Sequence, residues 1–322
     1  TSRKTTHRKV KASEVISFKH YKNLPIGFKY NWLSFTSQFK IELISLFKHI
    51  PFMVLLLFWI FLFAVELKDT FLNGPYRTRP FPTTGAIIEE IRSIKFALIL
   101  ILFYAAELIG REKAANILGL IYSTPVKYKV LYFAKCLTLF VLIIVLVTVN
   151  IGIGIGLQLA NGYTNLELGT YLQLYYYSTF PLFLFVILIV FVQNLATNKY
   201  AGMLLSMIVT FIFVFSDQLG LEHYLLRFAT IPPLQFSYFN GFGHFASAFN
   251  WYILYWCAFS VLLIVLTIGM WQSSLHFTFL DRLKILPKFL YQSKTLLILS
   301  FFIWISCGLF IYQQTNIINS YQ

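Results

Sequence analysis

Long apolar runs constrain this sequence more than any other feature. Seven runs come close to or exceed the roughly 20 residues that a helix needs to cross a bilayer. They lie at residues 50–66, 94–110, 133–159, 171–192, 201–217, 251–271 and 295–312. Charged residues make up only 12% of the chain, about half their usual share in a soluble globular protein. The sequence therefore predicts an all-α integral membrane protein for which the bilayer is the solvent.

The distribution of Lys and Arg predicts the orientation of these spans, because basic residues are enriched in cytoplasmic loops. With the N-terminus inside, the inside segments 1–49, 111–135, 193–200 and 272–294 hold 20 of the 26 basic residues. We therefore expect the N-terminus inside and the C-terminus outside. Ten of these basic residues precede the first span, where anionic lipid and topology account for them, so the net charge of +14 does not predict a nucleic-acid partner.

The segment before the first span predicts an amphipathic helix on the cytoplasmic membrane surface. Its apolar positions recur every three or four residues, at Trp32, Phe35, Phe39, Leu43, Leu46 and Ile50. Such a helix is either a membrane anchor or an elbow that transmits motion into the first span. Residues 1–31 form a basic tail or linker without a signal peptide, and we expect the chain to be a segment of something longer.

Motifs for chemistry within this chain are missing from the sequence. There is neither a G-x-x-x-x-G-K-[ST] phosphate loop nor an H-E-x-x-H zinc motif, so we predict no catalytic residue, metal or bound cofactor. Gly152 and Gly156 predict a small packing face in the third span, and Asn150 predicts a polar link between helices. Glu107 lies inside the second span one turn before Arg111, which makes an i,i+4 ion pair available.

The segment from Glu107 to Lys135 has the most specific pattern. A Glu ends the second span, an Arg-Glu pair opens the inside loop, and a short apolar helix leads to a Thr-Pro-Val turn, before a Lys begins the third span. This order resembles the membrane (permease) subunits of type-2 ABC exporters. The positions that carry it are Glu107, Arg111, Glu112, Lys113, Ile117, Leu118, Ile121, Thr124, Pro125 and Lys135.

The resemblance implies a six-span exporter membrane domain over residues 32–271, with a structured outer loop between its last two spans. It implies that residues 111–124 are a coupling helix that docks against a separate ABC ATPase, which binds ATP and Mg. The three apolar residues of that loop would fill a groove on the ATPase, and its three leading charged residues would set the register. The alternative interpretation, which needs no resemblance, is that residues 111–124 form an ordinary basic loop on the inside of the membrane.

Two further features resemble the large bacterial permeases of this family that continue into a zinc aminopeptidase-like domain. The first is a seventh span at 295–312, which follows an inside loop at 272–294 and carries residues 313–322 outside. The second is the run of turn formers in the outer loop, Asn240, Gly241, Gly243 and His244. The resemblance implies a bacterial cytoplasmic (inner) membrane protein, with any peptidase domain lying after Gln322.

We therefore expect the permease half of an ATP-driven exporter, paired with a second membrane half that is a copy or a different chain, and surrounded by lipid. Spans with few ionisable groups favour a lipidic, peptide or other amphipathic cargo over a small ion. Two alternatives stay open. One is a polytopic membrane enzyme for lipid-linked substrates, with Arg77, Arg79, Glu89 and Glu90 as outer contacts. The other is a membrane anchor for an outer peptidase-like domain.

Overall fold

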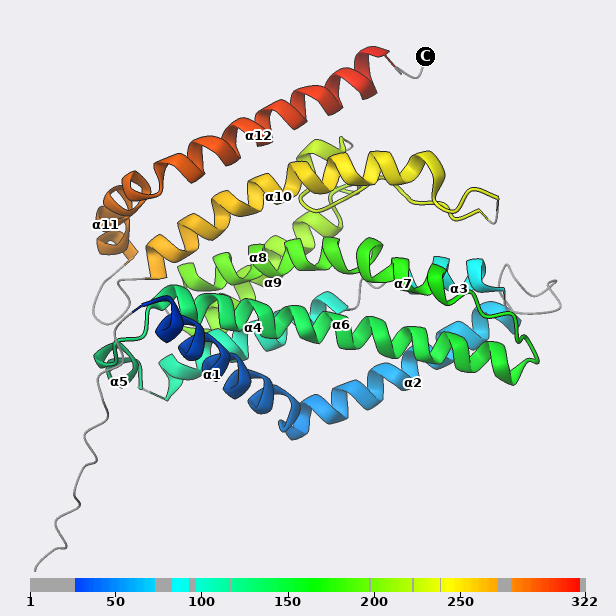
Figure 1. The fold of residues 1–322 in the computed structure, drawn as a ribbon, viewed down its shortest axis with the longest axis horizontal. Helices are drawn as coiled ribbons and strands as arrows, with labels where there is room; N and C mark the ends of the chain where they lie inside the picture. The colour runs from blue at the N-terminus through cyan, green and yellow to red at the C-terminus, as the bar shows by residue number, and fades with distance from the viewer. Residues whose placement is uncertain are drawn as a thin grey trace, which may run out of the picture.

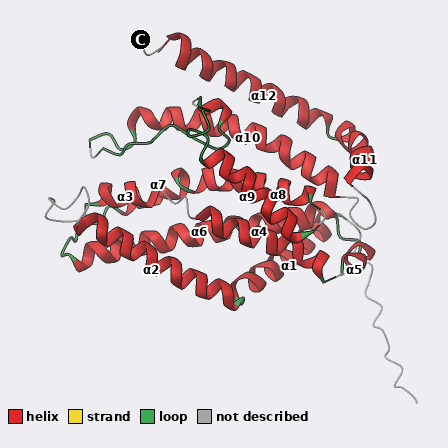
Figure 2. Ribbon diagram, turned by 180° about the vertical axis from the view of Figure 1, so that it is seen from behind, coloured by secondary structure: helices red, strands yellow, loops and turns green. Residues whose placement is uncertain are grey.

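The computed structural model describes residues 27–72, 83–92, 97–115, 117–196, 198–221, 223–237, 239–271 and 279–318. Within these ranges the regular structure is helical, apart from one isolated β-bridge between Ser237 and Gly241. Figures 1 and 2 show a bundle of long helices that run in roughly the same direction. The predicted all-α fold class is confirmed.

The α-helices of the described ranges follow one another along the chain, and the longest connection runs from Val214 at the end of α9 to Gly243 at the start of α10. In order, they are α1 (Phe28–Phe47), α2 (Ile50–Leu72), α3 (Thr84–Arg92), α4 (Ala97–Ala114), α5 (Leu118–Ser123), α6 (Tyr128–Ala160), α7 (Leu168–Tyr177), α8 (Thr179–Leu195), α9 (Lys199–Val214), α10 (Gly243–Trp271), α11 (Phe279–Gln292) and α12 (Lys294–Tyr312). A 3-10 turn lies at Tyr224–Leu226 and a π-helical turn at Gln313–Ile318.

Six of the seven predicted spans each fall on one helix, and the span at 171–192 falls on α7 and α8, which only Ser178 separates. With α7 and α8 counted as one, the described part of the chain has five helices long and apolar enough to cross a membrane. These five are Ile50–Phe71, Tyr128–Ala160, Leu168–Leu195, Phe245–Trp271 and Lys294–Ile318. The helix over Lys199–Val214 is apolar but shorter. Helix α4 covers residues 97–110 of the second predicted span, whose first three residues lie outside the described ranges, and it ends in the charged sequence Gly-Arg-Glu-Lys-Ala. A count of seven crossings stays a prediction.

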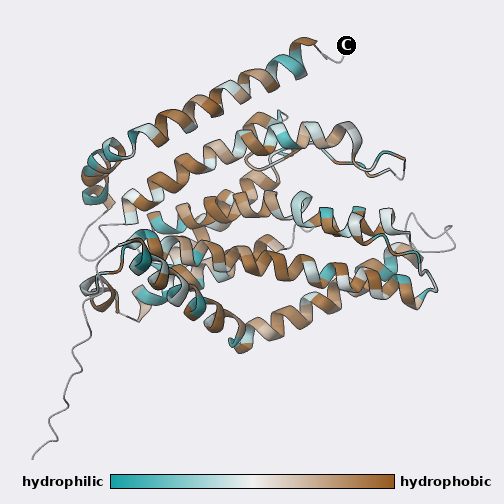
Figure 3. Ribbon diagram, viewed as in Figure 1, coloured by the Kyte–Doolittle hydropathy of each residue, from teal (hydrophilic) through white to brown (hydrophobic). Residues whose placement is uncertain are grey.

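The long helix α6 is central to the bundle and packs against α1, α2, α4 and α8, whereas α12 packs mainly on α10 (Figure 1). Apolar residues dominate the long helices, and polar residues gather on α1 and α11, at the end of the bundle where α5 lies (Figure 3). We call this the α5 end. By the distal end we mean the ends of α4, α8 and α9 that lie away from α5, and α2, α6 and α7 extend beyond it (Figure 1).

Polar and small residues in α6 fix its neighbours. Asn150 Oδ1 accepts a hydrogen bond of 2.8 Å from Trp59 Nε1, which confirms the predicted polar link between two helices. The predicted packing face of Gly152 and Gly156 is wrong within this chain, because a Cβ at either position would meet nothing within 4 Å. Gly154 lies on the other side of the helix and makes the close contact, since a Cβ there would lie 2.6 Å from Ile87 Cγ2.

The predicted amphipathic helix is present as α1, but its buried face differs from the predicted stripe. The stripe is predicted to face the membrane, and Trp32 is indeed exposed, but Leu46 is buried against the protein and the carboxylate-bearing Glu42 is completely buried. A one-dimensional apolar pattern cannot reveal this, because the inward face of α1 meets charged residues of α4 and α6.

The predicted domain boundaries stay predictions, and the described helices lie close to them. Helix α1 begins at Phe28, four residues ahead of the predicted membrane domain, while residues 1–26 of the predicted tail lie outside the described residues. The predicted cytoplasmic loop at 272–294 contains helix α11. Its buried Arg282 donates a 3.0 Å hydrogen bond to the carbonyl of Asn194, so α11 is held against the end of α8.

Candidate functional site

Four charged side chains from three helices meet at the α5 end. Glu42 comes from α1, Arg111 and Glu112 from the end of α4, and Lys135 from the second turn of α6. Glu42 Oε2 lies 2.7 Å from Arg111 Nη2, and Glu42 Oε1 lies 3.0 Å from Lys135 Nζ. Lys135 Nζ also lies 2.9 Å from Glu112 Oε1. We call these four residues the charge network.

The charge network is deeply buried and formally neutral. The side chains of Glu42 and Lys135 are 0% exposed, that of Glu112 is 7% exposed and that of Arg111 is 31% exposed. Charges in a low-dielectric interior are costly unless they are paired and hydrogen-bonded. Two acids and two bases balance here, so the network forms without a net buried charge.

The surrounding polar groups complete the hydrogen bonding of the network. The three ammonium N–H groups of Lys135 have three acceptors, the two carboxylates and the carbonyl oxygen of Leu108. Gln38 Nε2 donates a 2.9 Å bond to Glu42, and Arg111 Nη1 donates to Ser45 Oγ. A buried network satisfied in this way rigidifies its surroundings, so it fixes α1, α4 and α6 relative to one another.

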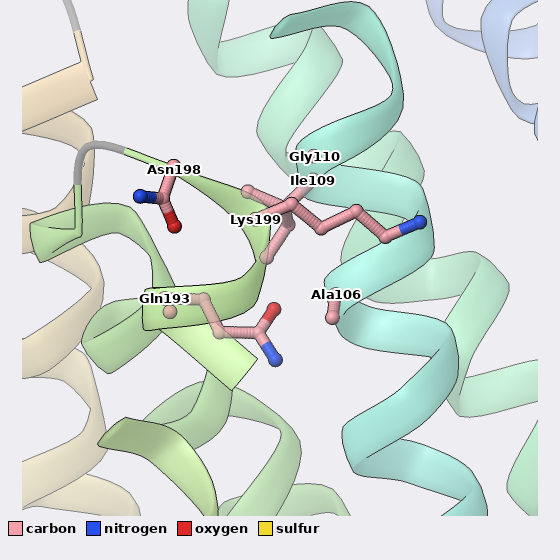
Figure 4. A pocket seen from close by; sticks show the side chains of 7 residues that line it. Ala106, Ile109, Gly110, Gln193, Asn198 and Lys199 are labelled. Carbon is pink, nitrogen blue, oxygen red and sulfur yellow. The ribbon is translucent and has the colours of Figure 1, made fainter. Parts of the chain in front are cut away.

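The end of α4 is also joined to α9. Glu107 forms an ion pair with Lys199, the first residue of α9. The stem of Lys199 crosses Gly110, where a Cβ would lie 2.7 Å from Lys199 Cβ (Figure 4). The cavity in Figure 4 has a volume of about 10 Å³, about one water at most. This contact is therefore helix packing and not a ligand site.

The i,i+4 ion pair expected between Glu107 and Arg111 is replaced by two longer-range pairs. Arg111 pairs with Glu42 of α1, and Glu107 pairs with Lys199 of α9. The local pair would be partly solvated and worth only a few tenths of a kcal/mol. The pairs with α1 and α9 instead neutralise the charges of Arg111 and Glu107, whose side chains helix packing has already partly removed from water.

The predicted coupling loop places its apolar side chains outside. Ile117 is 41% exposed and Leu120 is 72% exposed, while Ile121 is half-buried. Thr124 follows the end of α5 and donates a hydrogen bond of 2.5 Å to the carbonyl of Ile121, and Pro125 then prevents the helix from continuing. The side chains of Lys113 and Leu118 lie outside the described residues.

The predicted site residues fall into two groups, one exposed around α5 and one buried. Ile117, Thr124 and Pro125 belong to the exposed group. Arg111, Glu112 and Lys135 belong to the charge network, so Glu112 faces the interior and not the surface of the loop. Sequence reasoning missed Glu42 and Lys199. The signal for Glu42 is its position three residues after Phe39 and four before Leu46, which puts a carboxylate on an apolar stripe.

The outer-loop residues form a tight turn that leads into α10. Gly241 and Gly243 have φ values of +57° and +47°, a conformation that favours glycine. A Cβ at Gly243 would lie 2.6 Å from Asn240 Nδ2. The side chain of His244 lies outside the described residues, and within the described residues no three His, Cys, Asp or Glu side chains gather as a metal site.

The geometry defines a polytopic α-helical membrane protein with a charge network at one end of its bundle and a short exposed helix beside it. A family model described as "ABC-2 family transporter protein" matches residues 40–217, more than half of the chain. The chain therefore belongs to the ABC-2 transporter family and is the membrane permease of an ABC transporter. Neither the curated proteins nor the solved structures contain a match.

Proposed function

We propose that this permease is driven by a separate ABC ATPase that docks on α5, and that the charge network passes the motion of α5 into the bundle. The observation that carries the proposal is the position of Glu112 and Arg111. They lie between α5 and the rest of α4, and their side chains contact both α1 and α6. A push on α5 therefore moves two side chains that are paired to two further helices.

The surface of α5 supports docking by a protein with an apolar groove. Leu120 is the most exposed of its described large apolar side chains, with Ile117 three residues before it on the same helical face. These residues lie at the α5 end, close to the polar residues of α1 and α11 (Figure 3). ATP and Mg would be bound by the ATPase, and a second membrane half, identical or different, would complete the transporter.

The network also provides a route to the first long helix. Helix α1 ends at Phe47, and α2 begins at Ile50 after a sharp bend (Figure 1). Because Glu42 lies near the end of α1, displacement of Arg111 acts on α1 close to this bend. This arrangement favours the elbow interpretation of α1 over the simple anchor. It is a mechanical hypothesis of the hinge type.

The cargo, orientation and wider context belong to the same proposal. We infer an amphipathic cargo, lipidic or peptidic, because the long helices are rich in apolar and aromatic residues. The positive-inside bias supports a cytoplasmic N-terminus and an outer C-terminus, and the family resemblance implies a bacterial inner membrane. A zinc aminopeptidase-like domain after Gln322 remains a prediction of the family resemblance.

The experiment compares a docking variant with a network variant in the full chain. Leu120→Asp places a charge on the exposed face of α5, and we expect recovery of a copurifying ATPase to fall about tenfold or more, as for loss of one apolar anchor. Glu112→Gln keeps the α5 surface unchanged. We expect it to retain the ATPase but to lose stimulation of ATP hydrolysis by cargo lipid or peptide.

Lys284→Gln is the matched control, because Lys284 is 79% exposed on α11 at the same end of the bundle. It should change neither readout. Absence of any ATPase from preparations of monodisperse protein would refute the proposal and favour the membrane enzyme or the membrane anchor. Equal ATPase recovery with Leu120→Asp would refute docking on α5 specifically.

A further inference from the structure

Two adjoining cavities lie at the distal end of the bundle. The larger has a volume of about 510 Å³ and lies between α8, the end of α9 and the segment 224–234. The smaller has a volume of about 300 Å³ and lies between α4 and α9. The two share Leu98, Val214 and Asp217 in their walls. Their volumes are those of small-molecule sites, about 300–1,000 Å³.

A charged pair lines these cavities. Arg227 Nη2 lies 2.8 Å from Asp217 Oδ1, Arg227 Nε donates a 2.8 Å bond to Ser216 Oγ, and the guanidinium lies over the ring of Tyr224. These two bonds use two of the five guanidinium N–H donors. No acceptor for the others is found within the described part of the chain. Asp217 is 63% exposed and lines both cavities.

Each cavity also has a buried hydroxyl without a partner. Ser178 lines the larger cavity and is 5% exposed, and Thr210 lines the smaller and is 3% exposed. Among the described residues, neither hydroxyl oxygen has a hydrogen-bond partner. Leaving such a group unsatisfied costs about 1–3 kcal/mol, so both positions favour a ligand that brings acceptors.

The rest of the smaller cavity is apolar. Its apolar wall consists of Leu98, Ile99, Leu102, Phe211, Val214 and Phe215. Several of these side chains, including Ile99 and Phe211, are also exposed on the outside of the bundle, where a membrane protein meets hydrocarbon. The polar groups and the apolar wall therefore adjoin, which is the layout that an amphipathic molecule requires.

We propose that the two cavities together bind one glycerophospholipid whose headgroup carries both a phosphate and a primary ammonium. The phosphate accepts from the free N–H groups of Arg227, and the ammonium pairs with the carboxylate of Asp217. The ester carbonyls accept from Ser178 and Thr210, and a hydrocarbon chain lies against the apolar wall. This site needs no ATPase and does not depend on docking at α5.

The arrangement disfavours other occupants of the same cavities. An anionic headgroup gains the contact with Arg227 but is repelled by the carboxylate of Asp217. A pure hydrocarbon leaves the remaining N–H groups of Arg227 and both hydroxyls without acceptors. A water-soluble zwitterion satisfies the charges but leaves the apolar wall of the smaller cavity unused.

The test is native mass spectrometry of the purified, delipidated full chain with equimolar phosphatidylethanolamine, phosphatidylglycerol and phosphatidylcholine of identical acyl chains. We expect phosphatidylethanolamine to occupy the protein several-fold more than either competitor. Asp217→Asn should abolish its advantage over phosphatidylglycerol. Arg227→Gln should lower binding of all three lipids about tenfold, as for loss of a charged hydrogen-bond partner.

Two further variants make the test independent of misfolding. Asp281→Asn removes a carboxylate from the ion pair with Lys284 on α11, at the α5 end, and should leave lipid preference unchanged. Ile99→Trp narrows the smaller cavity from a position that is 55% exposed, and it should reduce binding of all three lipids without lowering the melting temperature.

Four results would overturn the proposal. One is equal binding of phosphatidylethanolamine and phosphatidylglycerol to the wild-type chain. The second is a preference for phosphatidylethanolamine that persists in Asp217→Asn, and the third is a lipid occupancy that Ile99→Trp leaves unchanged. The fourth is equally strong binding of free phosphoethanolamine, which would show a headgroup site without a lipid chain. Each result concerns binding to the permease alone, so the proposed ATPase docking is neither supported nor refuted by it.

Discussion

Removing Lys135 should destabilise the protein mainly by leaving a buried negative charge without a partner. In the wild type, Lys135 pairs with Glu42 and Glu112, and the four network charges sum to zero. Lys135→Met retains the apolar stem but gives the network a net charge of −1. Removing one partner of a buried pair typically costs about 3–5 kcal/mol. The high end is expected here, because both carboxylates are almost fully buried.

A second substitution turns this expectation into a test of the charge balance. Adding Glu112→Gln to Lys135→Met removes the stranded carboxylate, and Glu42 keeps its pair with Arg111 at 2.7 Å. The double variant should therefore be more stable than Lys135→Met alone, with a coupling free energy of about 1–3 kcal/mol. The assay is the free energy of unfolding in detergent micelles for the wild type, the single variants and the double variant.

The control for this cycle is Lys284→Met. Lys284 and Asp281 form a pair at 3.6 Å in which the lysine is 79% exposed, and such surface pairs contribute about 0–1 kcal/mol. Its substitution should hardly change the unfolding free energy. Strictly additive effects of Lys135→Met and Glu112→Gln would refute the reasoning, since the residues would then not act as one charge-balanced unit.

Three further predictions concern packing, hydrogen bonding and pH. Gly154→Val should destabilise by about 1–3 kcal/mol through overpacking against Ile87, whereas Gly152→Ala, with open space at its Cβ, should be neutral or stabilising by up to about 1 kcal/mol; thermal unfolding of both distinguishes them. Trp59→Phe should lower the unfolding free energy by about 0.6 kcal/mol, the average for an interhelical hydrogen bond in a membrane. In a variant that already carries Asn150→Leu, the same Trp59→Phe substitution should cost less in the same assay. Burial, with the nearby carboxylates of Glu66 and Glu89, raises the pKa of Glu90 above its ordinary 4.5. The stability that protonated Glu90 contributes is therefore fully present below the unfolded-state pKa and is lost as pH rises through the higher folded-state pKa. Glu90→Gln should flatten this part of the curve of unfolding free energy against pH. An unchanged curve would contradict the raised pKa of Glu90.

The positions of the helices were accessible from the sequence because they depend on local properties. Apolar runs indicate burial in hydrocarbon directly, and every predicted span is helical in its described residues, although the span at 171–192 is divided between α7 and α8. Pro125 and the turn former Thr124 mark the end of α5 for reasons of backbone chemistry alone. The order of residues from Glu107 to Lys135 was specific enough to indicate the transporter family.

Pairings across helices were not accessible in the same way. Arg111 has one sequence neighbour of opposite charge at the right helical spacing, Glu107, yet the structure pairs it with Glu42, 69 residues away. The glycine prediction failed for a similar reason, because the face of α6 that needs a small residue is set by Ile87 of α3. Which face of a helix meets which neighbour is a property of packing and not of periodicity.

Helix α4 joins the two regions that carry the proposals. Its first turns supply Leu98 and Leu102 to the distal cavities, and its last turns supply Arg111 and Glu112 to the charge network. An 18-residue helix is about 27 Å long at 1.5 Å per residue and is hydrogen-bonded throughout, so a shift at one end displaces the other. If lipid binding and ATPase docking favour different positions of α4, each must change the other's affinity by the same factor, because coupling between two binding equilibria is reciprocal. A network with no net charge suits this role, since it can hold α4 firmly in one position without trapping an uncompensated charge when α4 moves.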